Sequence, residues 1–346
     1  MLISADLAMS VARALLERAG VPEEHARLQA EVLVQAELRG HASHGLQRLP
    51  RLLKRICNGL VNVSTTGRHS WQRSAYLHVE GEAGMGPVVA IAAIQALIAR
   101  VPETGIAVAG ISNSNHLGML APYVEQVAEA GCIGIALSSS EALVHPHGGA
   151  EAMLGTNPIA IAVPGRPGEP FVLDLATGIV SMGKVHDHAL RGEPLEEGWA
   201  LDAEGRPTTD AEAAKAGSLA SFGGAKGFGL GLGFELLVAS IAGSAFAPDV
   251  RGTLDDRHPA NKGDVFIVID PARNGLADAI AGYLDRVRNA RVREGAGRIL
   301  VPGDRARSRR QEALANGINI APALWSRLSG PEATKLFSLR EEGHPS

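Results

Sequence analysis

The sequence has only two cysteines, Cys57 and Cys132, among 346 residues, and aromatic residues make up only 4% of it. Two cysteines are too few for a disulfide framework or a zinc ribbon, which favours a reducing compartment. The N-terminal segment Met1–Asp6 has no basic region followed by an apolar one, and no apolar run of about eighteen residues is free of glycine and polar residues. We therefore expect a cytoplasmic protein without an export signal or membrane span.

Charge of one sign is also lacking, since the formal net charge is only −4 with 20% charged and 45% hydrophobic residues. This balance argues against disorder and against a nucleic-acid-binding surface, so a small molecule is the expected partner. A chain of 346 residues exceeds what one hydrophobic core usually supports. Two lobes are expected, and they should be closely packed because no low-complexity linker separates them.

Three common catalytic motifs are missing. The sequence has no Gly-x-Gly-x-x-Gly of a Rossmann dinucleotide site, no His-Glu-x-x-His and no Gly-x-Ser-x-Gly. Its densest glycine cluster, Gly223–Gly231, has the wrong spacing for a phosphate loop. Lys226 in this cluster could face a phosphate at a helix start, or the glycines could serve close helix packing, and the sequence does not separate these readings.

Histidines occur in three close pairs, which raises the question of a metal. Asp187 and Glu141 lie near two of the pairs, so a zinc-dependent hydrolase is kept as an alternative. The Pro146 and Gly148 neighbours of one pair indicate a turn rather than a ligand strand, and we expect no metal. The pairs are His41 with His44, His145 with His147, and His186 with His188.

The hydrophobic pattern predicts a helical N-terminal part of about seventy residues, then α/β alternation, then helix and loop over the last fifty residues. N-terminal helices are expected after Ser4 or Asp6, from Pro22 to Gly40, and from Leu46 to Asn58 with Pro50 in the first turn. Further helices are predicted at 87–100, around 123–131, 229–241 and 276–292, and strands at 105–111, 132–137, 159–163, 171–173 and 265–269.

The segment Arg39–Arg48 sets a hydroxyl, an imidazole and a guanidinium within a few residues. His44 titrates near neutral pH and is the first candidate for general acid/base, while Arg48 presents a planar fork that matches a carboxylate. Together they suit a small 2-oxo or 2-hydroxy acid. In the alternative interpretation, His41 and His44 only cap a helix and Arg48 is a solvated charge.

Six ordered motifs spread over nearly the whole chain resemble the type 2 malate/L-lactate dehydrogenase family, whose NAD(P)-binding fold is not the Rossmann fold. They are Arg39–Gly45, Asn113–Gly118, Leu154–Ala160, Asp174–Thr177, Gly198–Asp202 with Pro207–Asp210, and Gly224–Gly227. The resemblance implies an α/β fold with a mixed-sheet cofactor- and substrate-binding domain at 76–299. It also implies a helical domain built from 1–75 and 300–346, which carries the His/Arg cluster.

The resemblance also implies roles for individual residues. His44 would be the proton donor, held by Ser43, while Arg48, Thr156 and Ser140 would lie in the substrate site. His116 competes with His44 for the acid/base role. The cofactor, NAD or NADP, would contact His116, Leu117, Gly118, Met119, Leu120, Asp174, Leu175, Ala176, Met182, Gly183, Lys226, Gly227 and Arg305. Taken one by one, Arg305, Arg307, Arg309 and Arg310 are more typical of a solvated charge run than of ligand-binding residues.

Members of this family reduce malate-, lactate-, sulfolactate-, diketogulonate- and ureidoglycolate-type substrates or the cyclic imines piperideine- and pyrroline-2-carboxylate. The imine reductases tend to carry an acidic residue where this chain has Lys184, which favours a dehydrogenase acting on the CH–OH group of a hydroxy acid. Ser138-Ser139 and His145-Pro146 also depart from the usual Thr-Asn and Ala-Pro, so the substrate itself stays open. By resemblance the default assembly is a homodimer.

Overall fold

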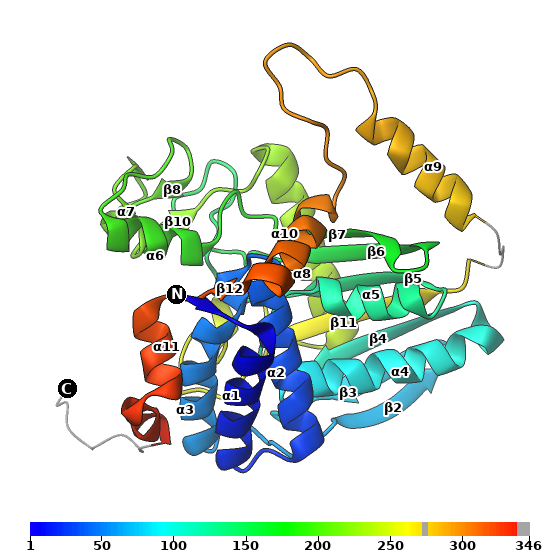
Figure 1. Ribbon diagram of the computed structural model, residues 1–346, viewed down its shortest axis with the longest axis horizontal. Coiled ribbons are helices and arrows are strands. Elements are labelled where there is room, and N and C mark those ends of the chain that lie inside the picture. Colours follow the sequence, from blue (N-terminus) through cyan, green and yellow to red (C-terminus); the bar gives the residue numbers. More distant parts are fainter. Residues whose placement is uncertain (272–275, 338–346) are drawn as a thin grey trace.

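A seven-stranded mixed sheet forms the centre of the computed structural model, which describes residues 1–271 and 276–337 (Figure 1). The strand order is β2, β3, β4, β11, β5, β6, β7. Only β3 and β4 run parallel in this sheet, and its other neighbours are antiparallel. A Rossmann sheet is mostly parallel, so the expected mixed α/β fold is confirmed. The strands are β2 (Arg68–Arg73), β3 (Tyr76–Glu80), β4 (Ile106–Ser112), β5 (Ile133–Ser138), β6 (Ile159–Arg166), β7 (Glu169–Leu175) and β11 (Gly263–Ile269).

Helices cover both faces of this sheet. Alternate side chains of β11 point to opposite faces, and Phe266 and Val268 join the core under α4 and α5 while Val265 and Ile267 pack against α8. The two-sided burial explains why these strands read as continuous apolar runs in the sequence. The three helices are α4 (Gly86–Thr104), α5 (Ala121–Glu129) and α8 (Ala225–Ala242).

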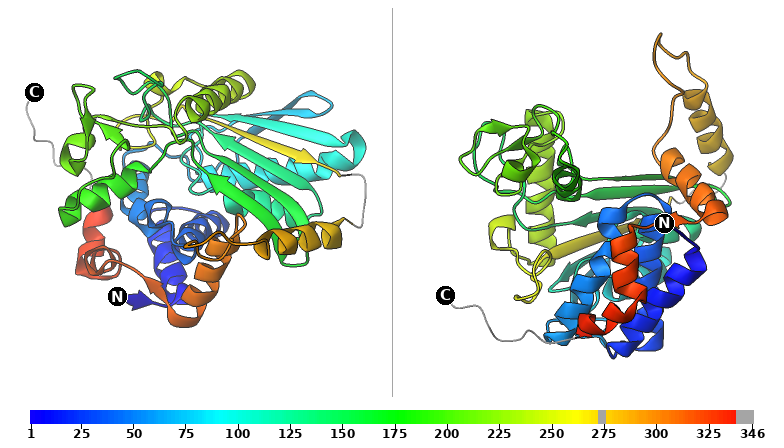
Figure 2. Two further views of the ribbon diagram at one scale, coloured as in Figure 1. Left: turned by 90° about the horizontal axis from the view of Figure 1, so that it is seen from above. Right: turned by 60° about the vertical axis from the view of Figure 1, so that its left-hand side comes forward.

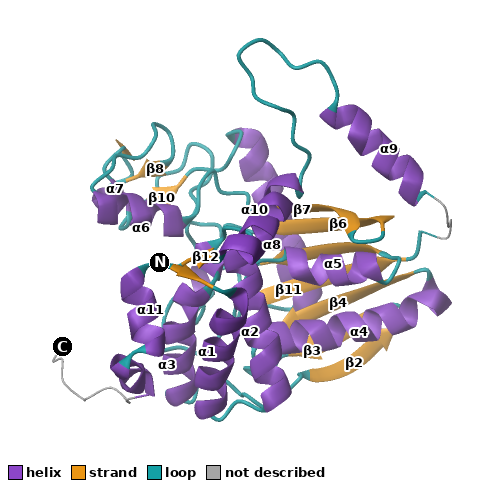
Figure 3. Cartoon of the chain, in the orientation of Figure 1, coloured by secondary structure: helices purple, strands orange, loops and turns teal. Residues whose placement is uncertain are grey.

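The helical part of the molecule combines both ends of the chain (Figure 3). The Ser4 hydroxyl caps α1 by accepting a hydrogen bond from Leu7 N–H, and Pro50 lies in the first turn of α3. The sequence assigned 68–75 to this part, but β2 pairs with β3 in the large sheet. The elements are α1 (Ala5–Arg18), α2 (Glu23–Leu38), α3 (Leu49–Cys57), α10 (Asp304–Asn316), α11 (Pro322–Ser329) and the paired strands β1 (Leu2–Ile3) and β12 (Ile318–Asn319).

A small third unit, which the sequence did not predict, lies beside the helical part (Figure 2). Each of its strands is only two residues long, so no period-two pattern marks them. Its core includes Val185, Leu195 and Trp199. The elements are α6 (Met182–Arg191), α7 (Ala211–Ala214) and the antiparallel strands β8 (Ala200–Leu201), β9 (Pro207–Thr208) and β10 (Ser218–Leu219).

Three helices stand out by their exposure or their apolar length. Helix α9 (Ala277–Arg288) has no buried residue, and the segment after it projects from the body of the molecule (Figure 1). Among the described residues, α4 and α8 are long and apolar enough to cross a membrane by length and composition alone. Both pack on the sheet as core helices do, although only a third of the apolar window in α8 is buried.

Candidate active site

A buried carboxyl group at the end of α2 holds the loop that carries the His/Arg cluster. Glu37 Oε1 accepts a hydrogen bond from Leu46 N–H at 2.7 Å, and burial raises the pKa of Glu37 to about 7. A Cβ at Gly45 would collide with this carboxyl group, so the close approach requires glycine there. The chain winds through two short 3₁₀ turns, Ala42–His44 and Leu46–Arg48, before α3 begins at Leu49.

The hydroxyl, imidazole and guanidinium that the sequence singled out are direct neighbours. Ser43 Oγ and His44 Nδ1 are hydrogen-bonded at 3.0 Å, and Arg48 Nε donates to the carbonyl oxygen of Ser43 at 2.8 Å. The two terminal nitrogens of Arg48 make no hydrogen bond to the described residues and can bind a carboxylate. Neither His41 nor His44 caps a helix through its side chain.

The environment keeps His44 neutral at pH 7. Burial is the main cause that lowers the pKa of His44 to about 4, and the positive charge of Arg48 contributes next. A neutral imidazole can accept a proton, and the neighbouring arginine has free terminal nitrogens that can bind an anion. A carboxylate bound at Arg48 offsets the charge of that guanidinium and thereby favours protonation of His44.

A second imidazole, His116, stacks on the first with ring centroids 5.7 Å apart. Gly118 N–H donates to His116 Nδ1 at 2.9 Å, so the ring proton lies on Nε2. Protonation would turn Nδ1 into a second donor against this amide, and burial already lowers the pKa of His116 well below its usual value. The Ser43 hydroxyl, by contrast, can donate to His44 Nδ1 or accept from it. Only His44 has a partner that suits both protonation states.

A small cavity of about 50 Å³ lies beside His116 and is also lined by Arg48, Arg51, Arg55 and Thr253 among others. Burial, and then the charge of Arg51, lowers the pKa of Arg48 to about 10. Arg55 is structural, because it donates to Asn115 Oδ1 at 2.9 Å and to the carbonyl oxygens of residues 255 and 258. Arg48 is therefore a partly buried arginine of this cavity whose terminal nitrogens make no hydrogen bond to the described residues.

Two further residues assigned to the substrate site form a separate group. Ser140 Oγ accepts a hydrogen bond from Thr156 N–H at 3.1 Å, and the Thr156 carbonyl oxygen accepts from both N–H and Oγ of Thr177. Among the described residues no hydrogen bond links this group to Arg48. Ser140 thus acts on the position of Thr156, while Thr156 keeps its own hydroxyl available for a ligand.

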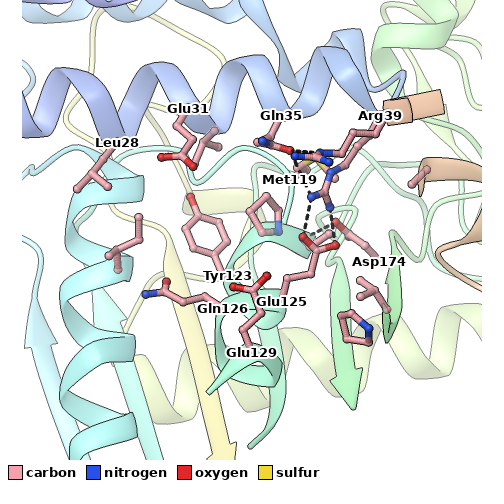
Figure 4. A pocket seen from close by; sticks show the side chains of 18 of the residues that line it. Leu28, Glu31, Gln35, Arg39, Met119, Tyr123, Glu125, Gln126, Glu129 and Asp174 are labelled. Carbon is pink, nitrogen blue, oxygen red and sulfur yellow. Dashed lines mark hydrogen bonds and ion pairs between the residues drawn. The ribbon is translucent and has the colours of Figure 1, made fainter. Parts of the chain in front are cut away.

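Residues of the expected cofactor site line a groove of about 880 Å³ between α2, α4, α5 and α10 (Figure 4). Asp174 accepts hydrogen bonds from Leu120 N–H and Ala121 N–H at the start of α5, and burial raises its pKa to about 6. Met119 lies on the groove side of this loop, whereas His116 and Gly118 line the small cavity. The loop 116–120 therefore borders both the groove and the small cavity.

Other predicted cofactor residues are more scattered. Gly183 packs against the catalytic loop, since a Cβ there would lie 2.8 Å from Ser43 Cβ. Lys226 and Arg305 are exposed, and Arg305 does not line the groove, whereas Arg307 and Arg310 do. Gly227 allows the turn before α8 to approach closely, because a Cβ there would overlap the carbonyl oxygen of residue 222. Leu117 is buried, Met182 and Leu175 are partly buried, and Ala176 is exposed.

The histidine pairs have separate partners. His145 Nδ1 hydrogen-bonds to Ser218 Oγ at 3.0 Å, and His188 Nδ1 to the carbonyl oxygen of Pro194 at 2.9 Å. Among residues 1–271 and 276–337 no group of three or more His, Cys, Asp or Glu side chains could hold a metal ion. The described residues therefore give no support to the zinc hydrolase alternative.

Sequence reasoning missed a buried ion pair behind the imidazoles. Lys262 and Asp264, which are 1% and 0% exposed at the side chain, are paired, and Asp264 also accepts hydrogen bonds from Ser138 Oγ and Ser114 Oγ. The available signal was a charged residue directly before the apolar run of β11. Glu141 was noted only for its closeness to a histidine pair, although its carboxylate helps to keep Arg48 charged by raising the pKa of that side chain.

Comparison with known proteins identifies the family to which the chain is similar. A family model described as malate/L-lactate dehydrogenase matches residues 3–329. The L-sulfolactate dehydrogenase of Methanocaldococcus jannaschii is 34% identical over 91% of each chain. The (2R)-3-sulfolactate dehydrogenase (NADP(+)) of Chromohalobacter salexigens is 36% identical over 90% of this chain and 92% of its own. The ureidoglycolate dehydrogenase (NAD(+)) of Escherichia coli K12 is 35% identical over 90% of each chain.

Solved structures extend the similarity to the fold. A dehydrogenase from Sinorhizobium meliloti is 53% identical, with a TM-score of 0.92 over 98% of both chains. The delta1-piperideine-2-carboxylate reductase of Pseudomonas syringae pvar. tomato is 31% identical, with a TM-score of 0.85 over 95% of this chain and 98% of its own. The similarity therefore spans the helical part, the sheet and the small third unit together.

Proposed function

Because this chain belongs to the malate/L-lactate dehydrogenase family, we propose that His44 and Arg48 perform the proton transfer and the carboxylate binding of an NAD(P)-dependent dehydrogenase. The protein is an oxidoreductase that acts on a CH–OH group and interconverts a small 2-hydroxy and 2-oxo carboxylic acid. The observation that carries the proposal is the contact of Ser43 with both His44 and Arg48.

The chemistry divides among few groups. The bound nicotinamide supplies or accepts a hydride at its C4 atom. The terminal nitrogens of Arg48 bind the substrate carboxylate, which places the neighbouring C2 oxygen within reach of the imidazoles. In oxidation, Nε2 of His44 takes the proton of the substrate hydroxyl group, while Ser43 Oγ accepts a hydrogen bond from Nδ1–H of His44. In reduction, His44 returns that proton to the substrate oxygen. His116 Nε2–H donates a hydrogen bond to the same substrate oxygen.

The groove beside Asp174 is the proposed place of the dinucleotide. Its volume of about 880 Å³ lies within the range of cofactor sites. Arg307 and Arg310 on its wall supply the positive charge that phosphates need. Asp174 already accepts two backbone hydrogen bonds, so it shapes the groove by fixing the loop 116–120. Both NAD and NADP remain compatible with this wall.

A cyclic imine bearing a carboxylate is the second candidate substrate, because one solved neighbour is a piperideine-2-carboxylate reductase. Lys184 disfavours it, since its ammonium group lies 4.4 Å from the centre of the Trp199 ring and no carboxylate is hydrogen-bonded to Ser43 in the described chain. Without that carboxylate the Ser43–His44 pair has no acidic third member. The hydroxy-acid reading is favoured for this reason.

Absorbance of reduced nicotinamide tests the function directly. The purified protein is mixed with NADH or NADPH and with pyruvate, oxaloacetate, branched 2-oxo acids or the two cyclic imines. We expect oxidation of the cofactor with at least one 2-oxo acid and none with the imines. Turnover of an imine alone would establish the second candidate, and an absence of cofactor binding would contradict the proposed function.

Replacing Arg48 with lysine is expected to raise KM for the 2-oxo acid by about ten- to hundredfold and to lower kcat by less. Lysine keeps the positive charge but loses the bidentate fork, and it has a methylene group in place of the Nε–H that donates to the Ser43 carbonyl oxygen. Steady-state kinetics at saturating cofactor measure both constants. An unchanged KM would remove Arg48 from the carboxylate site, and Arg206→Lys, at an exposed arginine that pairs with Asp202, serves as the matched control.

We also propose that the protein is a homodimer in the cytosol. The two free cysteines are in keeping with a reducing compartment. The exposed side of α8 carries Leu230, Leu236 and Leu237, which are 40–50% exposed, and such a patch is typical of an interface. Light scattering after gel filtration is expected to give twice the chain mass of 36.0 kDa. Leu236→Glu should yield the monomer, whereas Leu190→Glu, at an isolated exposed leucine, should not. A monomeric wild type would contradict the proposal.

A further inference from the structure

One carboxylate oxygen near the proposed substrate site is buried without a hydrogen-bond donor. Glu141 Oε1 accepts from Thr253 N–H at 2.8 Å and from Leu254 N–H at 3.0 Å. Glu141 Oε2 is buried and has no partner among the described residues. A buried acceptor that lacks a donor costs free energy, so such an atom calls for a specific explanation.

The position of Glu141 connects the two walls of the site. The preceding residue, Ser140, fixes Thr156 through its hydroxyl, and the loop that Glu141 grips contributes Thr253 to the cavity of Arg48 and His116. The negative charge of Glu141 acts on both Arg48 and Arg55, since it raises the pKa of each. The carboxylate therefore lies near the carboxylate-binding arginine without pairing with it.

We propose that Glu141 Oε2 binds a hydrogen-bond donor on the side chain of the substrate and so determines specificity. The proposal rests on the proposed dehydrogenase function and narrows it to 2-oxo acids that carry a hydroxyl or amide N–H one or two atoms beyond C2. A carboxylate accepts hydrogen bonds and repels anions. A second acidic group, as in oxaloacetate, is therefore disfavoured at this position, while Arg48 holds the first carboxylate.

Matched substrate pairs test the preference with the full-length protein and its better cofactor. The pairs are hydroxypyruvate against pyruvate, and 4-hydroxy-2-oxobutyrate against 2-oxobutyrate, with oxaloacetate as the dianion. We expect kcat/KM to be about ten- to hundredfold higher for the hydroxylated member of at least one pair, the usual weight of one hydrogen bond to a charged group. Oxaloacetate should be the poorest substrate of the five.

The variant Glu141→Gln separates specificity from folding. Its amide oxygen still accepts from Thr253 and Leu254, so the loop keeps its anchor, but the other end becomes a donor. The preference for the hydroxylated substrate should fall to within about threefold, and kcat/KM for oxaloacetate should rise, because an amide N–H₂ can donate to a carboxylate. Glu151→Gln, at an exposed glutamate nearby, is the control and should leave all five values unchanged.

The outcomes distinguish the two proposals. If the wild type reduces none of the five acids or imines with either cofactor, the proposed function fails. If it reduces 2-oxo acids without preferring either hydroxylated member, or if Glu141→Gln keeps the wild-type ranking, only the role of Glu141 fails. Melting temperatures of both variants close to that of the wild type establish that the kinetic changes do not come from unfolding.

Discussion

Replacing His44 with alanine is expected to lower kcat by about 10²–10⁴-fold while the Kd of the cofactor stays nearly constant. The imidazole is hydrogen-bonded to Ser43 and lies next to Arg48, and it is not among the residues that line the groove assigned to the dinucleotide. Its removal eliminates the group that exchanges a proton with the substrate oxygen and leaves carboxylate binding in place. Steady-state absorbance of the nicotinamide gives kcat, and quenching of protein fluorescence gives the Kd.

Two comparisons make the His44 result specific. His116→Ala should cost less than His44→Ala, because the Gly118 amide restricts His116 to one protonation state. The reverse order would move the acid/base role to His116. His69→Ala changes an exposed imidazole on β2, at a residue that lines neither cavity, and should leave kcat near the wild-type value.

The pH dependence of kcat/KM tests the role of His44 independently. Since the pKa of His44 is lowered to about 4, kcat/KM for oxidation of the hydroxy acid is expected to stay level from pH 8 to about pH 5 and to fall below it. In His44→Ala this fall should disappear. A wild-type profile that already declines near pH 6.5 would mean that His44 is not desolvated in the working enzyme.

The parts of the fold that the sequence predicted share a long apolar pattern. Helix α4 was expected at 87–100 and runs over Gly86–Thr104, and β11 was expected at 265–269 and runs over Gly263–Ile269. The third unit escaped because strands such as β8 span two residues and carry no period. Strand β2 escaped because the side chains of Arg68–Arg73 are nearly all exposed at the sheet edge and so lack an apolar face.

The site divides in a similar way. Ser43, His44 and Arg48 lie within six residues, so local spacing was sufficient to group them. Glu141 follows β5, whereas Lys262 and Asp264 lie at the start of β11, and the antiparallel pairing of β11 with β5 brings these segments together. These charged residues become notable only because they are buried, and the sequence alone does not show which polar residues are buried.

The ion pair of Lys262 and Asp264 should dominate the stability of this region. Replacing Lys262 with methionine is expected to lower the free energy of unfolding by about 3–5 kcal/mol, because it leaves a fully buried carboxylate with two hydroxyl donors and no countercharge. Equilibrium unfolding in urea at fixed protein concentration measures the loss. A change below about 1 kcal/mol would show that water reaches Asp264.

Two further variants identify the cause of that loss. Lys215→Met removes a lysine that pairs with the exposed Glu212, and surface pairs contribute only about 0–1 kcal/mol, so its effect should be small. Lys262→Met/Asp264→Leu removes both buried charges and should recover most of the loss, short of the cost of leaving the hydroxyls of Ser114 and Ser138 without an acceptor. Because Lys262 also accepts the Asn113 N–H at its carbonyl oxygen, the pair stabilises the segment that carries His116. Lys262→Met should therefore lower kcat as well. If the double variant regains stability but not kcat, the charges of Lys262 and Asp264 position the imidazole of His116 in addition to stabilising the fold.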